Sequence, residues 1–183
     1  MIEFQDISFS YPEGTEGGLK NINLTIPDGQ CVLFCGQSGC GKTTLTRLVN
    51  GLIPQFFDGE LTGNVLFNGE NLFNVPMYQI AEKVGSVFQN PRTQFFNVDT
   101  DSEIVFGLEN EAVPQEELKS SVMETAKSLH IESLLGRNIF ALSGGEKQKI
   151  AFASVYAMNP EVYLLDEPSS NLDMATIKEL REH

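Results

Sequence analysis

The feature that most constrains this chain is a glycine-rich segment, Gly36-Gln37-Ser38-Gly39-Cys40-Gly41-Lys42-Thr43-Thr44. It fits the pattern G-x-x-x-x-G-K-[ST], in which a turn joins a strand to a helix. Such a turn points backbone N–H groups and a helix N-terminus at a polyphosphate, and larger side chains would block the approach. We expect Lys42 to reach the β- and γ-phosphates and the Thr43 hydroxyl to ligate Mg²⁺. The residues expected to bind nucleotide here are Gly36, Ser38, Gly39, Cys40, Gly41, Lys42, Thr43 and Thr44.

The segments beside this loop have the character that a phosphate loop requires. The run from Gln30 to Cys35 is almost continuously apolar, which predicts a strand covered on both faces. After the loop, Leu45, Leu48 and Val49 mark one side of a helix that should end near Gly51. The alternative is a glycine turn that matches the pattern by chance, and the strand and helix on either side disfavour it.

The rest of the chain alternates strands with helices, which predicts an α/β domain with a mostly parallel core sheet. Residues 2–8 and 19–26 alternate apolar and polar side chains and precede a turn at Pro27-Asp28-Gly29, so we expect an antiparallel β edge region there. Val84 to Phe88 predicts a second buried strand, and Glu161 to Leu165 predicts a third apolar strand. A final helix is expected from Asp173 onward.

The middle of the chain predicts helices. Pro114 should open a helix with acidic residues in its first turn, and Leu118, Val122, Ala126 and Leu129 form an apolar stripe along it. We therefore expect an α-helical subdomain, approximately residues 90–140, inserted in a single domain that spans 1–183.

Two carboxylates end the third predicted strand, at Asp166 and Glu167. Ligands of parallel sheets bind at the carboxyl ends of the strands. Asp166 is suited to hold Mg²⁺ through its water shell, and Glu167 to orient and polarise an attacking water. Alone, such a pair would more simply be a solvated turn, but beside a phosphate loop it predicts the second half of a nucleotide site.

The segment Ala141-Leu142-Ser143-Gly144-Gly145-Glu146-Lys147-Gln148 combines two features. Ser143 and Glu146 form an S-x-x-E capping box, which predicts a helix start whatever the function. The double glycine bares a second helix N-terminus suited to an anion. The segment resembles the LSGGQ signature of ABC ATPases, with Glu146 in place of the usual Gln. By that resemblance Ser143, Gly144 and Gly145 would cover the γ-phosphate that a second subunit's phosphate loop holds.

Other positions are similar to ABC ATPases in the same order along the chain. Tyr11 resembles the aromatic residue that stacks on adenine, although it could be an ordinary edge-strand tyrosine. Gln89 resembles the glutamine that touches Mg²⁺ and the attacking water, and Ser169 to Asp173 resembles the loop that crosses the dimer interface, with Asp173 near nucleotide. The resemblance thus implies Glu167 and Gln89 as catalytic residues and Thr43, Gln89 and Asp166 at the metal.

Less specific sequence similarities indicate a subfamily of the ABC ATPases. Val87 to Phe96, Glu103 to Asn110, and Asn50 to Pro54 resemble the ATPases of energy-coupling factor transporters, which import vitamins and transition-metal ions. The resemblance implies ATP and Mg²⁺ as cofactors and ATP hydrolysis that powers import. It also implies partners: a second ATPase domain, an integral membrane coupling component received by the segment from Gln89 to Asn110, and a substrate-binding membrane component. Phe95 and Phe96 could instead be core residues of the helical subdomain.

Composition limits where such a protein can act. Lys and Arg number 12 against 25 Asp and Glu, a formal net charge of -13, so the surface should repel nucleic acid. No apolar run approaches the roughly 20 residues that span a bilayer. We expect a cytoplasmic protein, peripheral at the membrane. Cys31, Cys35 and Cys40 lack metal-ligand spacing and are expected to be reduced thiols, two of them facing a core.

The end of the chain departs from the ABC pattern, which places a helix, a further strand and a switch histidine after the carboxylates. The residues from Glu167 to His183 leave room for the helix alone. We therefore expect a C-terminally incomplete domain that hydrolyses ATP negligibly by itself, with residues 30–35 and 161–165 roughly 9–10 Å apart around a missing strand. A catalytically silent nucleotide-binding module and a soluble, non-transport ABC protein are the alternatives.

Overall fold

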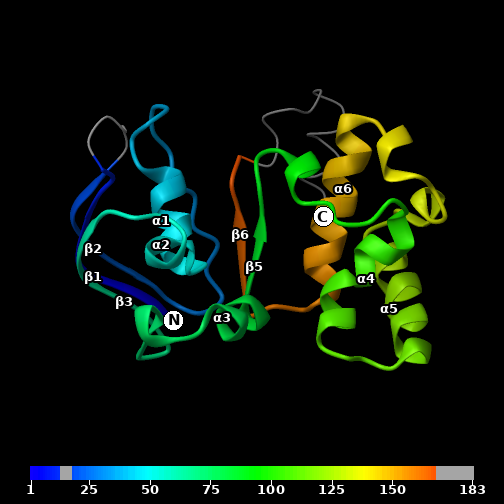
Figure 1. Ribbon diagram of the computed structural model, residues 1–183, viewed down its shortest axis with the longest axis horizontal. Helices are drawn as coiled ribbons and strands as arrows, with labels where there is room; N and C mark the ends of the chain where they lie inside the picture. Colours follow the sequence, from blue (N-terminus) through cyan, green and yellow to red (C-terminus); the bar gives the residue numbers. More distant parts are fainter. Residues whose placement is uncertain (13–17, 168–183) are drawn as a thin grey trace. The chain divides into compact units, whose positions relative to one another are not determined.

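The structure of the protein is a computed structural model that describes residues 1–12 and 18–167. It divides into two compact units, Met1–Val84 and Gly85–His183. Figure 1 labels the α-helices and, except for β4, the strands of both units. Within the described residues, no helix is long and apolar enough to cross a membrane.

The first unit is built on an antiparallel sheet with strand order β2-β1-β3-β4. Its strands are β1 (Ile2–Ser10), β2 (Leu19–Ile26), β3 (Glu60–Phe67) and β4 (Glu70–Asn71). The pairing Ile2↔Ile26 between β1 and β2 confirms the predicted antiparallel region. The third strand was not expected, although Leu61, Val65 and Phe67 carry a two-residue apolar period typical of strands.

A bulge in β1 changes which side chains face the core. Ile2 and Phe4 are buried, and the register then shifts so that Ile7 and Phe9 are buried as well. Asp6 has φ 49°, and Gly63 on β3 lies opposite with φ +85°. A Cβ at Gly63 would stand 2.4 Å from the carbonyl oxygen of Gln5, so only glycine fits there. The alternation of apolar and polar residues predicted from the sequence therefore gives the buried positions correctly only up to Phe4. Beyond the bulge, the buried residues are Ile7 and Phe9.

Helices complete the first unit: α1 (Lys42–Val49), α2 (Leu52–Gln55), the 3₁₀ turn η1 (Leu72–Asn74) and α3 (Met77–Lys83). Helix α1 begins directly after the glycine-rich loop, as predicted, and buries Leu48 and Val49. It ends at Asn50, and the following Gly51 has φ 78°, a left-handed conformation that favours glycine at helix ends.

The strand predicted before the loop is absent. Residues 30–35 are not assigned to any strand, and Leu33 is 83% exposed. A strand is held by backbone hydrogen bonds to its neighbours, and no described strand pairs with this segment. Residues 30–35 and 161–165 belong to different units, so the spacing expected between them stays a prediction. All three cysteines are free and exposed, so the expectation that two of them face a core is wrong.

The second unit joins a two-stranded sheet to a group of helices. Two predicted apolar runs form strands, β5 (Val84–Val87) and β6 (Val162–Leu165), and the structure shows that these two strands are neighbours. The helices are α4 (Thr100–Asn110), α5 (Gln115–Ser128) and α6 (Gly144–Ala157), and the 3₁₀ turns are η2 (Pro91–Thr93), η3 (Glu132–Leu134) and η4 (Ile139–Ala141).

The predicted apolar stripe of α5 faces the core of this unit. Val122 and Ala126 are buried in a cluster with Ile104 of α4 and Ile150 of α6, and Leu118 and Leu129 pack against it. Phe95 also packs on this cluster, whereas Phe96 is 75% exposed and stacks on Phe106 with ring centroids 4.7 Å apart. The two phenylalanines that the sequence left open thus differ: Phe95 is partly buried against the core, and Phe96 lies on the surface.

Candidate nucleotide site

The glycine-rich loop of the first unit is an exposed turn that ends in a helix. Gly41, with φ 97°, is the N-cap of α1, and its missing Cβ would stand 2.7 Å from Leu19 Cδ2. Lys42 Nζ donates hydrogen bonds to the carbonyl oxygens of Gly36 and Gln37, at 3.0 and 3.1 Å. The ammonium group therefore lies over the loop, where a bound anion would meet both it and the N-terminus of α1.

Cys40 is an exposed residue of this turn. A Cβ added at Gly36 would lie 2.6 Å from the Cys40 sulfur, so the thiol sits directly against the first glycine of the pattern. The backbone N–H of Cys40 donates to the carbonyl of Gln37 over 3.3 Å and closes the turn. Ser38 and Gly39 complete the loop and are exposed. Any group attached to the Cys40 sulfur would have to fit against the loop itself.

Tyr11 is anchored beside the same helix. Its hydroxyl accepts a hydrogen bond from Arg47 Nη1 at 2.9 Å and shares another with Thr44 Oγ1 at 3.3 Å. Its ring meets Phe9 edge-on, with centroids 4.7 Å apart, and Phe57 at 6.3 Å. Thr44, expected at the nucleotide, is almost fully buried beneath this tyrosine. The contact that the resemblance implies between Tyr11 and adenine stays a prediction.

In the second unit, the ends of β5 and β6 bring together two residues far apart in the sequence. Gln89 Nε2 donates a hydrogen bond to Glu167 Oε2 over 3.1 Å. The backbone N–H of Asp166 donates to the carbonyl of Val87 over 3.0 Å. The carboxyl ends of both strands therefore lie at one edge, which means that neighbouring β5 and β6 run in the same direction.

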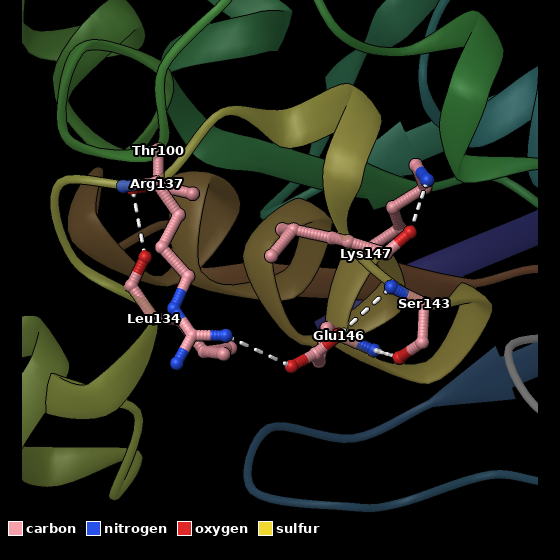
Figure 2. A network of polar contacts seen from close by, with 7 residues as sticks. Thr100, Leu134, Arg137, Ser143, Glu146 and Lys147 are labelled. Carbon is pink, nitrogen blue, oxygen red and sulfur yellow. Dashed lines mark hydrogen bonds and ion pairs between the residues drawn. The ribbon is translucent and has the colours of Figure 1, made fainter.

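The predicted capping box forms at the start of α6. Ser143 Oγ accepts a hydrogen bond from the backbone N–H of Glu146 at 3.3 Å, and Glu146 Oε2 accepts from the backbone N–H of Ser143 at 2.8 Å. The bond that the Ser143 backbone N–H donates to the Glu146 carboxylate lowers the pKa of Glu146, and the Ser143 hydroxyl, Arg137 and Lys147 lower it further. Figure 2 shows this network. Gly144 and Gly145 form the first turn of the helix, between the two capping residues.

The remaining residues named from the sequence lie outside the loop, the strand ends and the capping box. Asp173 and the loop from Ser169 lie outside the described residues. His130 is exposed just after α5, with φ 52°. Within residues 1–12 and 18–167, no three His, Cys, Asp or Glu side chains gather as a metal site.

Three charged residues were not anticipated. Glu103 is buried and accepts hydrogen bonds from the backbone N–H groups of Phe96 and Asn97, at 3.1 and 2.8 Å. Lys147 is buried and donates to the carbonyls of Phe140 and Leu142. The position of Lys147, one helical turn before Ile150 and Ala151, was a signal that it shares their buried face. Nothing in the sequence singled out the third, Arg137.

The phosphate loop at a helix N-terminus, the paired strand ends and the capped glycine turn define a phosphate-loop nucleotide-binding protein. The chain belongs to the ABC transporter family, whose model matches residues 19–170. Its fold is the α/β fold of these phosphate-loop ATPase domains, as predicted from the sequence.

Similar proteins agree with this membership. An ABC transporter ATP-binding protein, so named, of Treponema denticola is 60% identical over 100% of this chain and 37% of its own length. The energy-coupling factor transporter ATP-binding protein EcfA1 of Ligilactobacillus salivarius is 39% identical, over 94% of this chain and 60% of its own. The chain therefore spans well under half the length of the first of these relatives.

Two solved structures have the same fold. One is cbiO1 from Clostridium perfringens, described as part of the ABC transporter complex cbiONQ, with a TM-score of 0.85 and 30% identity over 99% of this chain and 70% of that one. The other is the ATP-binding cassette MJ0796, described as a dimer in a post-hydrolysis state with ADP and Pi. Its TM-score is 0.83 and its identity 26%, over 100% of this chain and 80% of that one.

Proposed function

We propose that the protein containing this chain binds ATP with Mg²⁺ and hydrolyses it, as the ATPase subunit of an energy-coupling factor importer. The observation that carries the catalytic part is the hydrogen bond between Gln89 and Glu167. It joins the amide and the carboxylate that ATP hydrolysis would need at the carboxyl ends of two neighbouring strands, where parallel sheets bind ligands.

The chemistry proposed for these residues is attack of water on the γ-phosphorus of ATP. A new P–O bond forms, the bond to the β–γ bridging oxygen breaks, and ADP and phosphate leave. Glu167 would accept a proton from the attacking water and Gln89 would orient that water. Lys42 and the backbone N–H groups from Gly36 to Thr43 would hold the phosphates in place.

The residues present suit a magnesium ion. The Thr43 hydroxyl and the Gln89 amide oxygen are hard oxygen ligands, the kind that Mg²⁺ prefers, and the Asp166 carboxylate would hold the ion through its water shell. Phosphate and water would fill the remaining positions. The ion would supply charge neutralisation on the β- and γ-phosphates. The assignment of these three residues to the metal site is part of the proposal.

The assignment to an importer rests on similarity and on one surface. EcfA1 is 39% identical and cbiO1 has the same fold, and their names place them in transport complexes. In the second unit, a recess of about 300 Å³ is lined by Arg92, Phe95, Phe140 and Lys147. Phe96 and Val98 are exposed in the segment expected to receive the membrane coupling component. Large exposed apolar side chains of this kind favour a protein partner.

The proposal also implies a cellular location for the protein and further protein partners. The nucleotide would be held between this domain and a second ATPase domain, with Ser143, Gly144 and Gly145 of one facing the phosphates of the other. The assembly would lie at the cytoplasmic face of the membrane, on a coupling component and a substrate-binding component.

Co-purification tests the importer assignment. The full-length protein should be isolated from membranes together with an integral membrane protein, and Phe96→Asp should abolish this without changing ATP affinity. Tyr78→Asp is the matched control, because Tyr78 is comparably exposed on the first unit. ATP hydrolysis by a full-length protein that never binds a membrane partner would favour a soluble ABC ATPase instead.

A further inference from the structure

Helix α6 begins with a carboxylate in the turn that is proposed to meet phosphate. Glu146 Oε2 accepts a hydrogen bond from the backbone N–H of Ser143, while Ser143 Oγ accepts one from the backbone N–H of Glu146. The box uses the backbone N–H groups of Ser143 and Glu146, and so leaves those of Gly144 and Gly145 at the start of the helix for an anion.

The negative charge of Glu146 would repel such an anion. A helix N-terminus carries roughly half a positive charge, whereas the carboxylate carries a full negative one. The hydrogen bonds from Ser143 lower the pKa of Glu146, so the carboxylate stays ionised at neutral pH. Without a neighbouring cation, this turn would repel a polyphosphate more than it attracts one.

Arg137 provides that cation. Its Nη1 lies 3.5 Å from Glu146 Oε1, the carboxylate oxygen that does not accept from Ser143. The two oxygens are thus held from two sides, one by the capping N–H and the other by the guanidinium group, as Figure 2 shows. The side chains are 50% and 34% exposed, so the pair lies at the surface and can face an incoming ligand.

The backbone of Arg137 is fixed by a buried residue of α4. Thr100 is fully buried, and its backbone N–H donates to the carbonyl of Arg137 over 3.0 Å. The N–H of Arg137 donates to Thr100 Oγ1 over 3.2 Å, and that hydroxyl in turn donates to the carbonyl of Leu134 over 2.9 Å. The base of the arginine side chain is therefore held in place, which reduces the conformational freedom lost when it pairs with Glu146.

We propose that Arg137 is a positioning residue for nucleotide: it holds the Glu146 carboxylate on the cap of α6 and offsets its charge, so that the phosphates of ATP can approach Ser143, Gly144 and Gly145. This role rests on the proposed function, in which that turn faces ATP held by a second domain. Arg137 acts through Glu146 and is not itself assigned a contact with the phosphates.

The test is a double-mutant cycle in the full-length protein. Arg137→Gln should raise the KM for ATP about two- to fivefold at low ionic strength, the size expected of a half-exposed ion pair, and less at high salt. Glu146→Gln keeps an acceptor for the Ser143 N–H and removes the charge. In the Arg137→Gln, Glu146→Gln protein, KM should therefore return to the wild-type value. Arg137→Lys keeps a positive charge and should remain close to wild type.

Two further measurements separate this role from a structural one. Binding of a fluorescent ATP analogue to the phosphate loop and the melting temperature should be unchanged by Arg137→Gln. Lys119→Gln is the matched control, because it removes one exposed positive charge from α5, and it should leave KM unaltered.

Any other outcome overturns either the role of Arg137 alone or the proposed function as well. An unchanged KM in Arg137→Gln, a raised KM that Glu146→Gln does not restore, or an equal rise in Lys119→Gln would overturn the assignment to Arg137 and leave the proposed function standing. A wild-type full-length protein that does not hydrolyse ATP would overturn the proposed function, and the role of Arg137 with it.

Discussion

The side-chain amide of Gln89 donates a hydrogen bond to the carboxylate of Glu167 over 3.1 Å, although 78 residues separate the two in the chain. Gln89 follows β5 and Glu167 follows β6, and the pairing of these strands is what brings them together. The bond joins the two residues that we propose to orient the attacking water and to accept its proton. Substituting each of them separately therefore tests the two roles.

Glu167→Gln should keep ATP affinity and lose turnover. The amide is nearly the same size and can still accept a hydrogen bond from Gln89, but it cannot take a proton from water. General-base catalysis is typically worth 10²–10⁴-fold, so we expect kcat of the full-length protein to fall by about that factor. Steady-state hydrolysis alongside nucleotide titration measures both quantities. Hydrolysis at the wild-type rate would remove Glu167 from the role of base.

Lys42→Ala should weaken nucleotide binding itself. Its ammonium group lies over the loop on the carbonyls of Gly36 and Gln37, where it would neutralise phosphate charge. Charged hydrogen bonds contribute about 1.5–3 kcal/mol, so ATP affinity should fall about 10- to 100-fold in calorimetric titration. Lys20→Ala, an exposed lysine on β2, is the control and should bind as wild type. Equal affinity in the two variants would contradict the placement of Lys42.

Alkylation of Cys40 should abolish ATP binding. The thiol is exposed and lies against Gly36, so a bulky adduct would occupy the turn that receives phosphate. Bound MgATP should slow the modification, which mass spectrometry can follow. Cys40→Ser retains Cys31 and Cys35, both exposed, and should become resistant to the reagent. Continued loss of binding in that variant would show that another cysteine is responsible.

Ser143→Ala should destabilise the protein through α6. Loss of a serine cap costs about 0.5–2 kcal/mol. The variant keeps the Ser143 backbone N–H, which is the largest cause of the lowered pKa of Glu146, and loses the smaller contribution of the Ser143 hydroxyl. A carboxyl group with a lowered pKa stabilises the fold at neutral pH, and this contribution is lost as the pH falls through the lowered value. Thermal melts from neutral to acidic pH should therefore show a difference between wild type and Ser143→Ala that shrinks at low pH. Ser120→Ala, on the exposed face of α5, should show no such trend.

Gly85→Ala should destabilise the second unit more than Gly107→Ala does. A Cβ at Gly85 would stand 2.3 Å from Val155 Cγ1 and 2.8 Å from Pro160 Cγ, two groups with little freedom to move. At Gly107 the nearest atom, also at 2.3 Å, is the sulfur of Met158, a flexible side chain that can rotate away. We expect a cost of about 1–3 kcal/mol at Gly85 and less at Gly107 in denaturant unfolding. The reverse order would show that the packing around Gly85 yields easily.

Local sequence signals predicted the local structure. The glycine pattern and the apolar periodicity placed α1 directly after the loop, and the S-x-x-E spacing placed the cap of α6, because turns and caps depend on residues within one or two helical turns. The apolar stripe of α5 was likewise read correctly, since its period follows from the helix itself.

Relations between distant segments needed the tertiary structure. The apolar run of residues 30–35 predicted a buried strand, yet a strand exists only where neighbours supply hydrogen bonds, and no described strand does so. The bulge opposite Gly63, the burial of Glu103 and the pairing of Arg137 with Glu146 likewise depend on residues brought together from elsewhere in the chain. The sequence by itself determined the family, the phosphate loop and the starts of α1, α5 and α6, because residue type and short spacing encode them. Only the tertiary structure decided which strands pair and which charges meet, because those contacts form between segments that no local pattern links.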